Sequence, residues 1–138
     1  MIVLDTNVVS ELMKAARDPR VEQWAAGQPA GSVYTTSVTQ AEILYGIQRL
    51  SPGRRRAALE EAAEGMFRED FDGRVLAFGG EAARAYASIA GQRERAGRPI
   101  SQFDAQIAAI TLVARATLAT RNISDYGGCG VKLVDPWK

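Results

Sequence analysis

The sequence predicts a parallel α/β sandwich. Short runs of β-forming residues alternate along the chain with segments of helical periodicity, which is typical of parallel sheets covered by helices. The chain has 138 residues, 46% of them hydrophobic and 24% charged, as in an ordinary soluble domain. No internal repeat, low-complexity segment or linker interrupts it. We therefore expect one domain that buries about two-thirds of its unfolded surface.

The first element is a short apolar strand over residues 2–4, and Asp5 follows it directly. Thr6 and Asn7 are suited to turn the chain and to cap a helix over residues 8–13. In an open α/β sheet, ligand chemistry collects at the carboxyl ends of the strands. Asp5 is therefore the first candidate for a functional side chain.

Pro19 suits the start of a second helix over residues 19–27, and a β-rich strand is expected over residues 32–35. Thr36 or Ser37 would cap the helix that follows, and Gln40 stands three residues after Ser37, as in a capping box. The spacing predicts an apolar stripe on this helix, made by Val38, Ala41, Leu44 and Tyr45.

A helix over residues 54–63 begins with three arginines, and the acids after them suggest a solvated face with internal ion pairs. Residues 74–78 form the third predicted strand, and an alanine-rich helix is expected over residues 81–96. The next segment, 105–114, is apolar nearly all round, which favours a central helix packed on both sides. Two more strands, 117–120 and 131–134, flank a loop over residues 121–130.

The composition excludes several kinds of chemistry. The chain has no histidine, so His-dependent nucleophilic catalysis and His-ligated zinc are excluded. Its single cysteine, Cys129, cannot form an internal disulfide. A net charge of +1 does not indicate nucleic-acid binding, although 14 arginines stand against 3 lysines, and arginine is the better phosphate ligand. No signal peptide or membrane-spanning run is recognisable, so a cytoplasmic protein is expected.

Four acids are expected at one edge of the sheet. Asp5 follows the first strand, Glu42 lies early in the helix after the second, Asp104 begins the helix before the fourth, and Asp125 lies in the loop after it with Asn122. Like charges gathered beside apolar segments repel one another, and a bound cation relieves that repulsion. An all-oxygen site suits Mg²⁺ or Mn²⁺. Taken singly, the same acids are ordinary helix-cap, surface and turn residues, and this alternative stays open.

Five stretches in order resemble the PIN-domain ribonucleases, and more narrowly the VapC toxins of type II toxin–antitoxin systems, including their FitB-like branch. The stretches are MIVLDTNVVSEL (1–12), TSVTQAEILYG (36–46), FDAQIAA (103–109), ATRNISDY (119–126) and VDPW (134–137). The resemblance covers the whole chain and implies a single PIN domain over residues 1–138. It implies a three-layer α/β/α sandwich with a parallel sheet of about five strands.

The resemblance also implies an activity and partners. A Mg²⁺-dependent endoribonuclease, in which Mn²⁺ can substitute, would form a homodimer and be inhibited by an antitoxin of the VapB type. The antitoxin would insert a segment into the active-site groove and bind operator DNA through its own N-terminal domain. The RNA substrate is not specified. The alternative is a catalytically silent module on the same scaffold, which binds RNA or antitoxin and uses its acids for antitoxin arginines.

Carried over by position, Asp5 and Asp104 match the principal metal ligands and Glu42 matches the third acid. The fourth place falls to Asp125, with Asn122 as an auxiliary ligand or in its stead. The resemblance further implies that four residues orient the acids or hold metal-bound water: Thr6, Asn7, Ser37 and Thr120. Candidate phosphate contacts, for which a solvated surface is the alternative, are Arg54, Arg55, Arg56, Arg93, Arg95, Arg98 and Arg121. Trp24 and Trp137 are expected to be core or interface residues.

Overall fold

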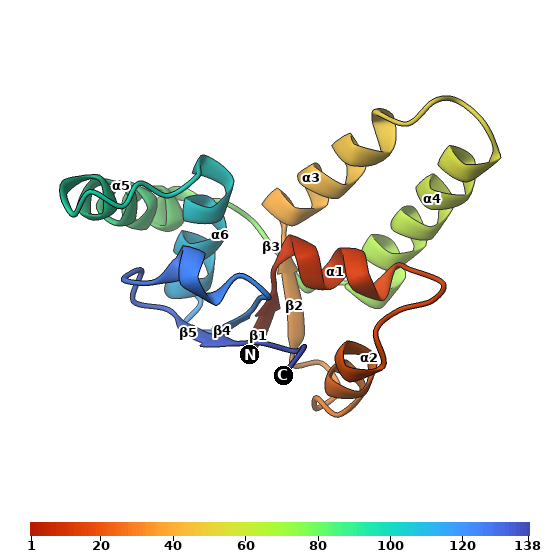
Figure 1. The fold of residues 1–138 in the computed structure, drawn as a ribbon, viewed down its shortest axis with the longest axis horizontal. Helices are drawn as coiled ribbons and strands as arrows, with labels where there is room; N and C mark the ends of the chain where they lie inside the picture. Colours follow the sequence, from red (N-terminus) through yellow and green to blue (C-terminus); the bar gives the residue numbers. More distant parts are fainter.

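The computed structural model describes all 138 residues and contains a five-stranded parallel sheet in the order β3-β2-β1-β4-β5 (Figure 1). The strands are β1 (Ile2–Leu4), β2 (Val33–Thr36), β3 (Val75–Leu76), β4 (Thr117–Ala119) and β5 (Lys132–Val134). In the register of the sheet, Ile2 of β1 pairs with Val33 on one side and with Thr117 on the other. The predicted fold class is confirmed.

Six α-helices connect or flank the strands: α1 (Thr6–Leu12), α2 (Pro19–Ala26), α3 (Ser37–Gln48), α4 (Arg54–Gly65), α5 (Gly80–Arg95) and α6 (Gln102–Val113). A π-helical turn, η1 (Met66–Asp70), continues α4. The predicted loop over residues 121–130 contains a 3-10 turn, η2 (Ile123–Tyr126). Of the strand predicted over residues 74–78, only Val75 and Leu76 pair with a neighbour.

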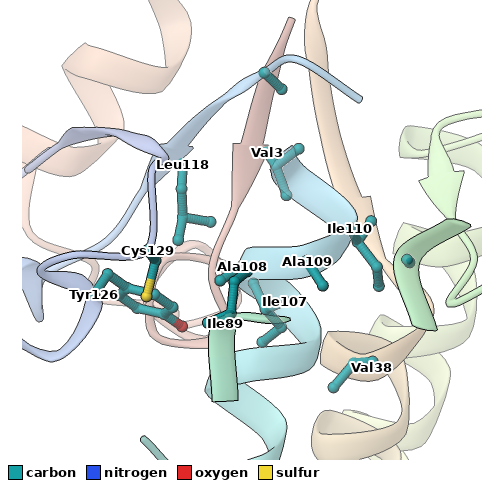
Figure 2. Packing of buried hydrophobic residues seen from close by; sticks show 12 residues of the cluster. Val3, Val38, Ile89, Ile107, Ala108, Ala109, Ile110, Leu118, Tyr126 and Cys129 are labelled. Carbon is teal, nitrogen blue, oxygen red and sulfur yellow. The ribbon is translucent and has the colours of Figure 1, made fainter. Parts of the chain in front are cut away.

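Two separate hydrophobic cores give the molecule its layers. On one side of the sheet, α5 and α6 pack in a core of 12 buried residues that includes Val3, Ile107 and Leu118 (Figure 2). On the other side, α1, α2, α4 and η1 surround a second core of 11 residues, with Leu4 at the sheet and Trp137 from the C-terminal segment. Helix α3 contributes to both cores. This arrangement makes three layers, with the predicted core placement of Trp137 confirmed.

Of the apolar stripe predicted on α3, only Val38 is buried. The buried residues of the helix are Val38, Thr39, Ile43 and Ile47, whereas Leu44 and Tyr45 are 40% and 66% exposed. The apolar pattern did not identify this face because it includes a polar residue, Thr39, whose hydroxyl is hydrogen-bonded to that of Thr6 inside the protein. The N-cap is Thr36, whose hydroxyl accepts a hydrogen bond from the Thr39 amide, so the capping box from Ser37 to Gln40 is not formed.

Helix α6 is central, as predicted. It contacts α5, α3 and β4, and it buries six consecutive or near-consecutive residues: Ala105, Ile107, Ala108, Ala109, Ile110 and Thr111. The Thr111 hydroxyl is satisfied inside the helix, because it donates to the Ile107 carbonyl at 2.8 Å. None of the helices combines the length and the apolarity that a bilayer crossing requires.

The strand order defines where a ligand site is expected. From β1 the chain moves to β2 and β3 on one side, and it later returns to place β4 and β5 on the other side. The connections therefore diverge between the carboxyl ends of β1 and β4, which is the usual position of a binding crevice in an open α/β sheet. Asp5 follows β1 and Thr120 follows β4 at this point.

Candidate active site

Asp5 lies at the carboxyl end of β1, in the crevice between β1 and β4, and is almost fully buried at 3% exposure. As the N-cap of α1, its Oδ1 accepts a hydrogen bond from the Thr6 amide at 2.8 Å. Its Oδ2 faces three donors, namely the Thr120 hydroxyl at 2.8 Å, the Tyr126 hydroxyl at 3.1 Å and the Asn7 amide group at 3.3 Å. These bonds fix the carboxylate in one orientation.

Asn7 connects the segment after β1 to the segment after β4 by hydrogen bonds. Its side-chain carbonyl accepts from the Arg121 amide at 3.2 Å, and its amide group lies 3.4 Å from the Thr120 hydroxyl. The Thr120 hydroxyl oxygen also accepts from the amide of Asn122 at 3.0 Å. The structure thus places three of the four predicted orienting residues, Thr6, Asn7 and Thr120, around Asp5.

Asp104 approaches the same point from the opposite side. It lies in the first turn of α6, where its amide donates to the capping hydroxyl of Ser101 at 3.2 Å. Its carboxylate oxygen Oδ1 lies 3.1 Å from the Tyr126 hydroxyl, which also contacts Asp5. Tyr126 was not among the predicted site residues. No periodicity or spacing marks it in the sequence, because it is simply the residue after Asp125.

Glu42 is linked to Asp5 through Thr6. The Thr6 hydroxyl donates to Glu42 Oε1 at 2.8 Å, and the same residue's amide donates to Asp5. Because that hydroxyl proton is used, the Thr39 hydroxyl must donate to Thr6 across the 3.0 Å between their oxygens. The fourth predicted orienting residue, Ser37, forms no hydrogen bond to any of the acids. Thr39 instead donates to Thr6, which in turn donates to Glu42.

Asp125, the fourth predicted acid, lies outside the cluster formed by the other three. Asp125 is exposed on η2, and its carboxylate has neither a hydrogen bond nor an ion pair. It lines a polar cavity of about 220 Å³ together with Asp104 and Arg93. Asn122 is also exposed, and only its backbone is engaged. The structure brings no three Asp, Glu or Cys side chains close enough together to hold one metal ion.

Besides burial, the charge of Asp104 nevertheless acts on the pKa of both Asp5 and Glu42. Burial raises the pKa of Asp5 above its ordinary value of 3.8, and the charge of Asp104 raises it further, against the hydrogen bonds from Thr120, Thr6 and Tyr126. Burial likewise raises the pKa of Glu42 above 4.5, with Asp5 and Asp104 as like charges nearby. Asp5 and Glu42 are therefore costly to ionise in the folded protein, and a cation would reduce that cost.

These shifts predict how stability depends on pH without metal. A carboxyl whose pKa is raised by folding stabilises the fold below its unfolded pKa, and this contribution disappears as the pH rises through the folded pKa. The melting temperature of EDTA-treated protein should therefore fall as the pH rises from the ordinary values of Asp5 and Glu42 through their raised ones. Scanning calorimetry at a series of pH values measures this fall.

The matched variant for that measurement is Glu42→Gln. Its amide oxygen can still accept from Thr6, but it cannot ionise. The melting temperature of this variant should fall less over the same range. Identical pH profiles for the two proteins would contradict the assignment of the effect to Glu42.

The predicted phosphate-contacting arginines lie in different surroundings. Arg54 and Arg55 are exposed at the N-terminus of α4 and form no ion pair, whereas Arg56 donates to Glu60 at 2.8 Å. The guanidinium of Arg121 lies over the Trp137 ring, 5.0 Å from its centroid. Arg95 and Arg98 are exposed on α5 and just beyond it.

Arg93 is the exception, because it is only 7% exposed and its charge is used inside the protein. Its Nε donates to the Arg98 carbonyl at 2.6 Å, and its Nη1 donates to the carbonyls of Asp125 and Gly127 at 2.9 and 3.0 Å. The prediction of a phosphate contact at Arg93 does not agree with this placement. A buried arginine was not expected from the sequence, because arginine is mostly exposed in proteins, although Arg93 lies one helical turn after the buried Ile89.

A groove adjoins Glu42 on the other side. A cavity of about 280 Å³ lies between α1, α3 and α4, and half of its lining residues are hydrophobic. Thr6 and Glu42 form its end at the acidic cluster, and Lys14 and Leu50 are among the residues that line the rest. The groove therefore offers an apolar surface that leads directly to the acids.

The fold and this site agree with one family. The PIN domain model matches residues 2–124, and the chain belongs to the PIN-domain family. It is 36% identical over 138 residues to VapC ribonuclease Y4jK of Sinorhizobium fredii, covering 100% of this chain and 99% of that protein. It is 33% identical over 137 residues to toxin FitB of Neisseria gonorrhoeae, covering 99% of each.

Solved structures extend the comparison. FitAcB from Neisseria gonorrhoeae matches with a TM-score of 0.92 and 33% identity, covering 99% of each chain. FitAB bound to an IR36 DNA fragment also gives a TM-score of 0.92 at 33% identity, covering 100% of this chain and 96% of the other. The resemblance to the VapC and FitB toxins is thereby confirmed over the full length.

Proposed function

We propose that this chain is the toxin of a type II toxin–antitoxin pair and that it hydrolyses RNA phosphodiester bonds with Mg²⁺, for which Mn²⁺ can substitute. The observation that supports this most strongly is the joining of Asp5 to Asp104 through Tyr126 and to Glu42 through Thr6. Membership of the PIN-domain family and relatives named VapC ribonuclease and toxin FitB support the same activity.

The side chains present suit a divalent cation. Asp5 and Asp104 would hold it, with Glu42 as the third acid and Asn122 or Asp125 completing the set. Mg²⁺ is often bound through one or two carboxylates, with substrate phosphate and water as the remaining ligands, so a cluster of three acids is not required. When bound, the cation would activate water and neutralise charge on the scissile phosphate.

The chain's own residues would do the rest. Thr6, Asn7 and Thr120 keep the Asp5 carboxylate oriented by donating to it. Glu42, with its raised pKa and a hydroxyl donor from Thr6, is suited to take a proton from the attacking water. Arg54, Arg55 and Arg98 are exposed and would contact flanking phosphates.

The partners follow from the same proposal. A VapB-type antitoxin would lay an apolar segment in the groove between α1, α3 and α4 and place a cationic side chain near Glu42. The toxin would act as a homodimer in the cytoplasm. Operator DNA would be bound through the antitoxin, consistent with a related FitAB structure that contains DNA.

Calorimetric titration of EDTA-treated protein with Mn²⁺ tests the metal site. Wild type should release or absorb heat on binding, and Asp5→Ala should lose this heat. Asp72→Ala, which changes an exposed acid outside the cluster, is the control and should bind as wild type does. If wild type gives no heat and cuts no RNA, the catalytically silent module is the correct reading.

A further inference from the structure

Tyr126 connects the two principal acids through a single atom. Its hydroxyl oxygen lies 3.1 Å from Asp5 Oδ2 and 3.1 Å from Asp104 Oδ1. Tyr126 is 1% exposed. Its side chain belongs to the core on the α6 side of the sheet and lies beside Cys129 (Figure 2). Asp5 is the N-cap of α1 and Asp104 lies in α6, whereas Tyr126 lies in η2, so its hydroxyl is positioned by an element that carries neither acid.

The backbone that carries Tyr126 is fixed on both sides by Arg93. The guanidinium donates to the carbonyl of Asp125, one residue before the tyrosine, and to that of Gly127, one residue after it. It also donates to the Arg98 carbonyl, and its Nη1 lies 3.6 Å from the Cys129 sulfur. Because these bonds involve neither acid, the tyrosine is held in place before any ligand arrives.

The hydroxyl matters more to Asp104 than to Asp5. Asp5 has three other donors, from Thr6, Thr120 and Asn7, and would keep its orientation without the tyrosine. The Asp104 carboxylate has no hydrogen bond other than the one from Tyr126. A tyrosine hydroxyl carries one proton and donates to one carboxylate at a time. Because Asp5 has other donors, this proton is available to Asp104.

We propose that Tyr126 is a positioning residue whose hydroxyl holds the Asp104 carboxylate beside Asp5 and thereby increases the affinity of the pair for a divalent cation. The second half of this statement rests on the proposed function, whereas the first half concerns the metal-free protein alone. Burial of the ring does not explain the hydroxyl, since phenylalanine would fill the same core without a polar group to satisfy.

Tyr126→Phe tests the proposal, with Tyr86→Phe as the matched control. Tyr86 is half-buried in the same core, packs edge-on against Phe78 and is not in contact with an acid. Groups that orient metal ligands are worth about 10- to 100-fold in metal affinity. Mn²⁺ titration should therefore show affinity about 10-fold or more lower in Tyr126→Phe and unchanged in Tyr86→Phe. Equal or tighter binding by Tyr126→Phe would overturn the proposal.

A crystal structure of each metal-free protein separates this inference from the proposed function. In Tyr126→Phe, the Asp104 carboxylate should leave its place beside Asp5, while Asp5 stays on Thr6 and Thr120. An unchanged Asp104 overturns the positioning role, whether or not wild type binds metal. Wild type that binds no Mn²⁺ instead refutes the metal site and, with it, the part of the proposal that concerns affinity.

The metal dependence of RNA cleavage provides a second readout. Because the acids themselves remain, the activity of Tyr126→Phe should recover as the Mg²⁺ concentration is raised. A loss that persists at saturating Mg²⁺, with affinity unchanged, would show that the hydroxyl acts in another way. The melting temperature of both variants reports whether the fold is intact.

Discussion

Asp104→Asn is expected to lower the rate of RNA cleavage by about 10³-fold or more, since charge stabilisation by a bound metal is worth several kcal/mol and each 1.36 kcal/mol corresponds to tenfold in rate. The asparagine can still accept from Tyr126, so the local packing is kept. The fold should be at least as stable as wild type, because Asp104 is a like charge that raises the pKa of both Asp5 and Glu42. Cleavage of a defined RNA and thermal unfolding measure the two effects.

Two companion variants make the result specific. Glu61→Gln removes an exposed acid on α4 and should leave cleavage unchanged. Asp125→Asn decides between Asp125 and Asn122 for the fourth position, since a loss comparable to that of Asp104→Asn would assign the role to Asp125. Cleavage by Asp104→Asn at the wild-type rate, in the same Mg²⁺, would refute its assignment as a metal ligand.

Arg93→Met should lower the free energy of unfolding by about 2–4 kcal/mol. Hydrogen bonds to charged groups contribute about 1.5–3 kcal/mol each, and water that hydrates the exposed carbonyls would offset part of their loss. The methionine keeps most of the aliphatic volume but leaves the carbonyls of Arg98, Asp125 and Gly127 without their donor. The segment that carries Tyr126 would then be free to move. Denaturant unfolding measures the stability, and Mn²⁺ titration measures the effect on the site.

Arg95→Met is the control for this prediction. Arg95 lies two residues further along α5 and is exposed, with no ion pair. Its replacement should change the free energy of unfolding by less than about 0.5 kcal/mol, as is usual for surface positions. Equal destabilisation by both substitutions would show that helix propensity, and not the bonds to the three carbonyls, explains the loss.

The sequence predicted the fold well because its strands and helices are separated by clear signals. Pro19 marks the start of α2, and the apolar run in α6 identifies the central helix. It failed where burial does not follow hydrophobicity. On α3, Thr39 is buried and Tyr45 is exposed, which a count of apolar residues reverses.

The sequence analysis named three acids and three supporting residues that the structure brings together, Asp5, Glu42, Asp104, Thr6, Asn7 and Thr120, but it did not name Tyr126 as a site residue or expect Arg93 to be buried. Asp5, Glu42 and Asp104 could be placed at one edge because each stands at a fixed point relative to a strand or a helix start. Tyr126 and Arg93 could not, because their roles depend on long-range contacts made by a loop. Arginine is mostly exposed in proteins and tyrosine is intermediate, so residue type alone does not predict that these two side chains are buried.

The acids of the candidate site lie beside two different hydrophobic cores, one on each side of the sheet. Asp5 and Glu42 stand beside Leu4 and Ile43 of one core, whereas Asp104 and Tyr126 belong to elements of the other. The distance between Asp5 and Asp104 therefore depends on how the two cores pack against the sheet. Close-packed interiors transmit small changes of side-chain volume. Substitutions that change side-chain volume at fully buried positions, such as Val9 or Ile107, are therefore expected to change the distance between Asp5 and Asp104 without altering the surface.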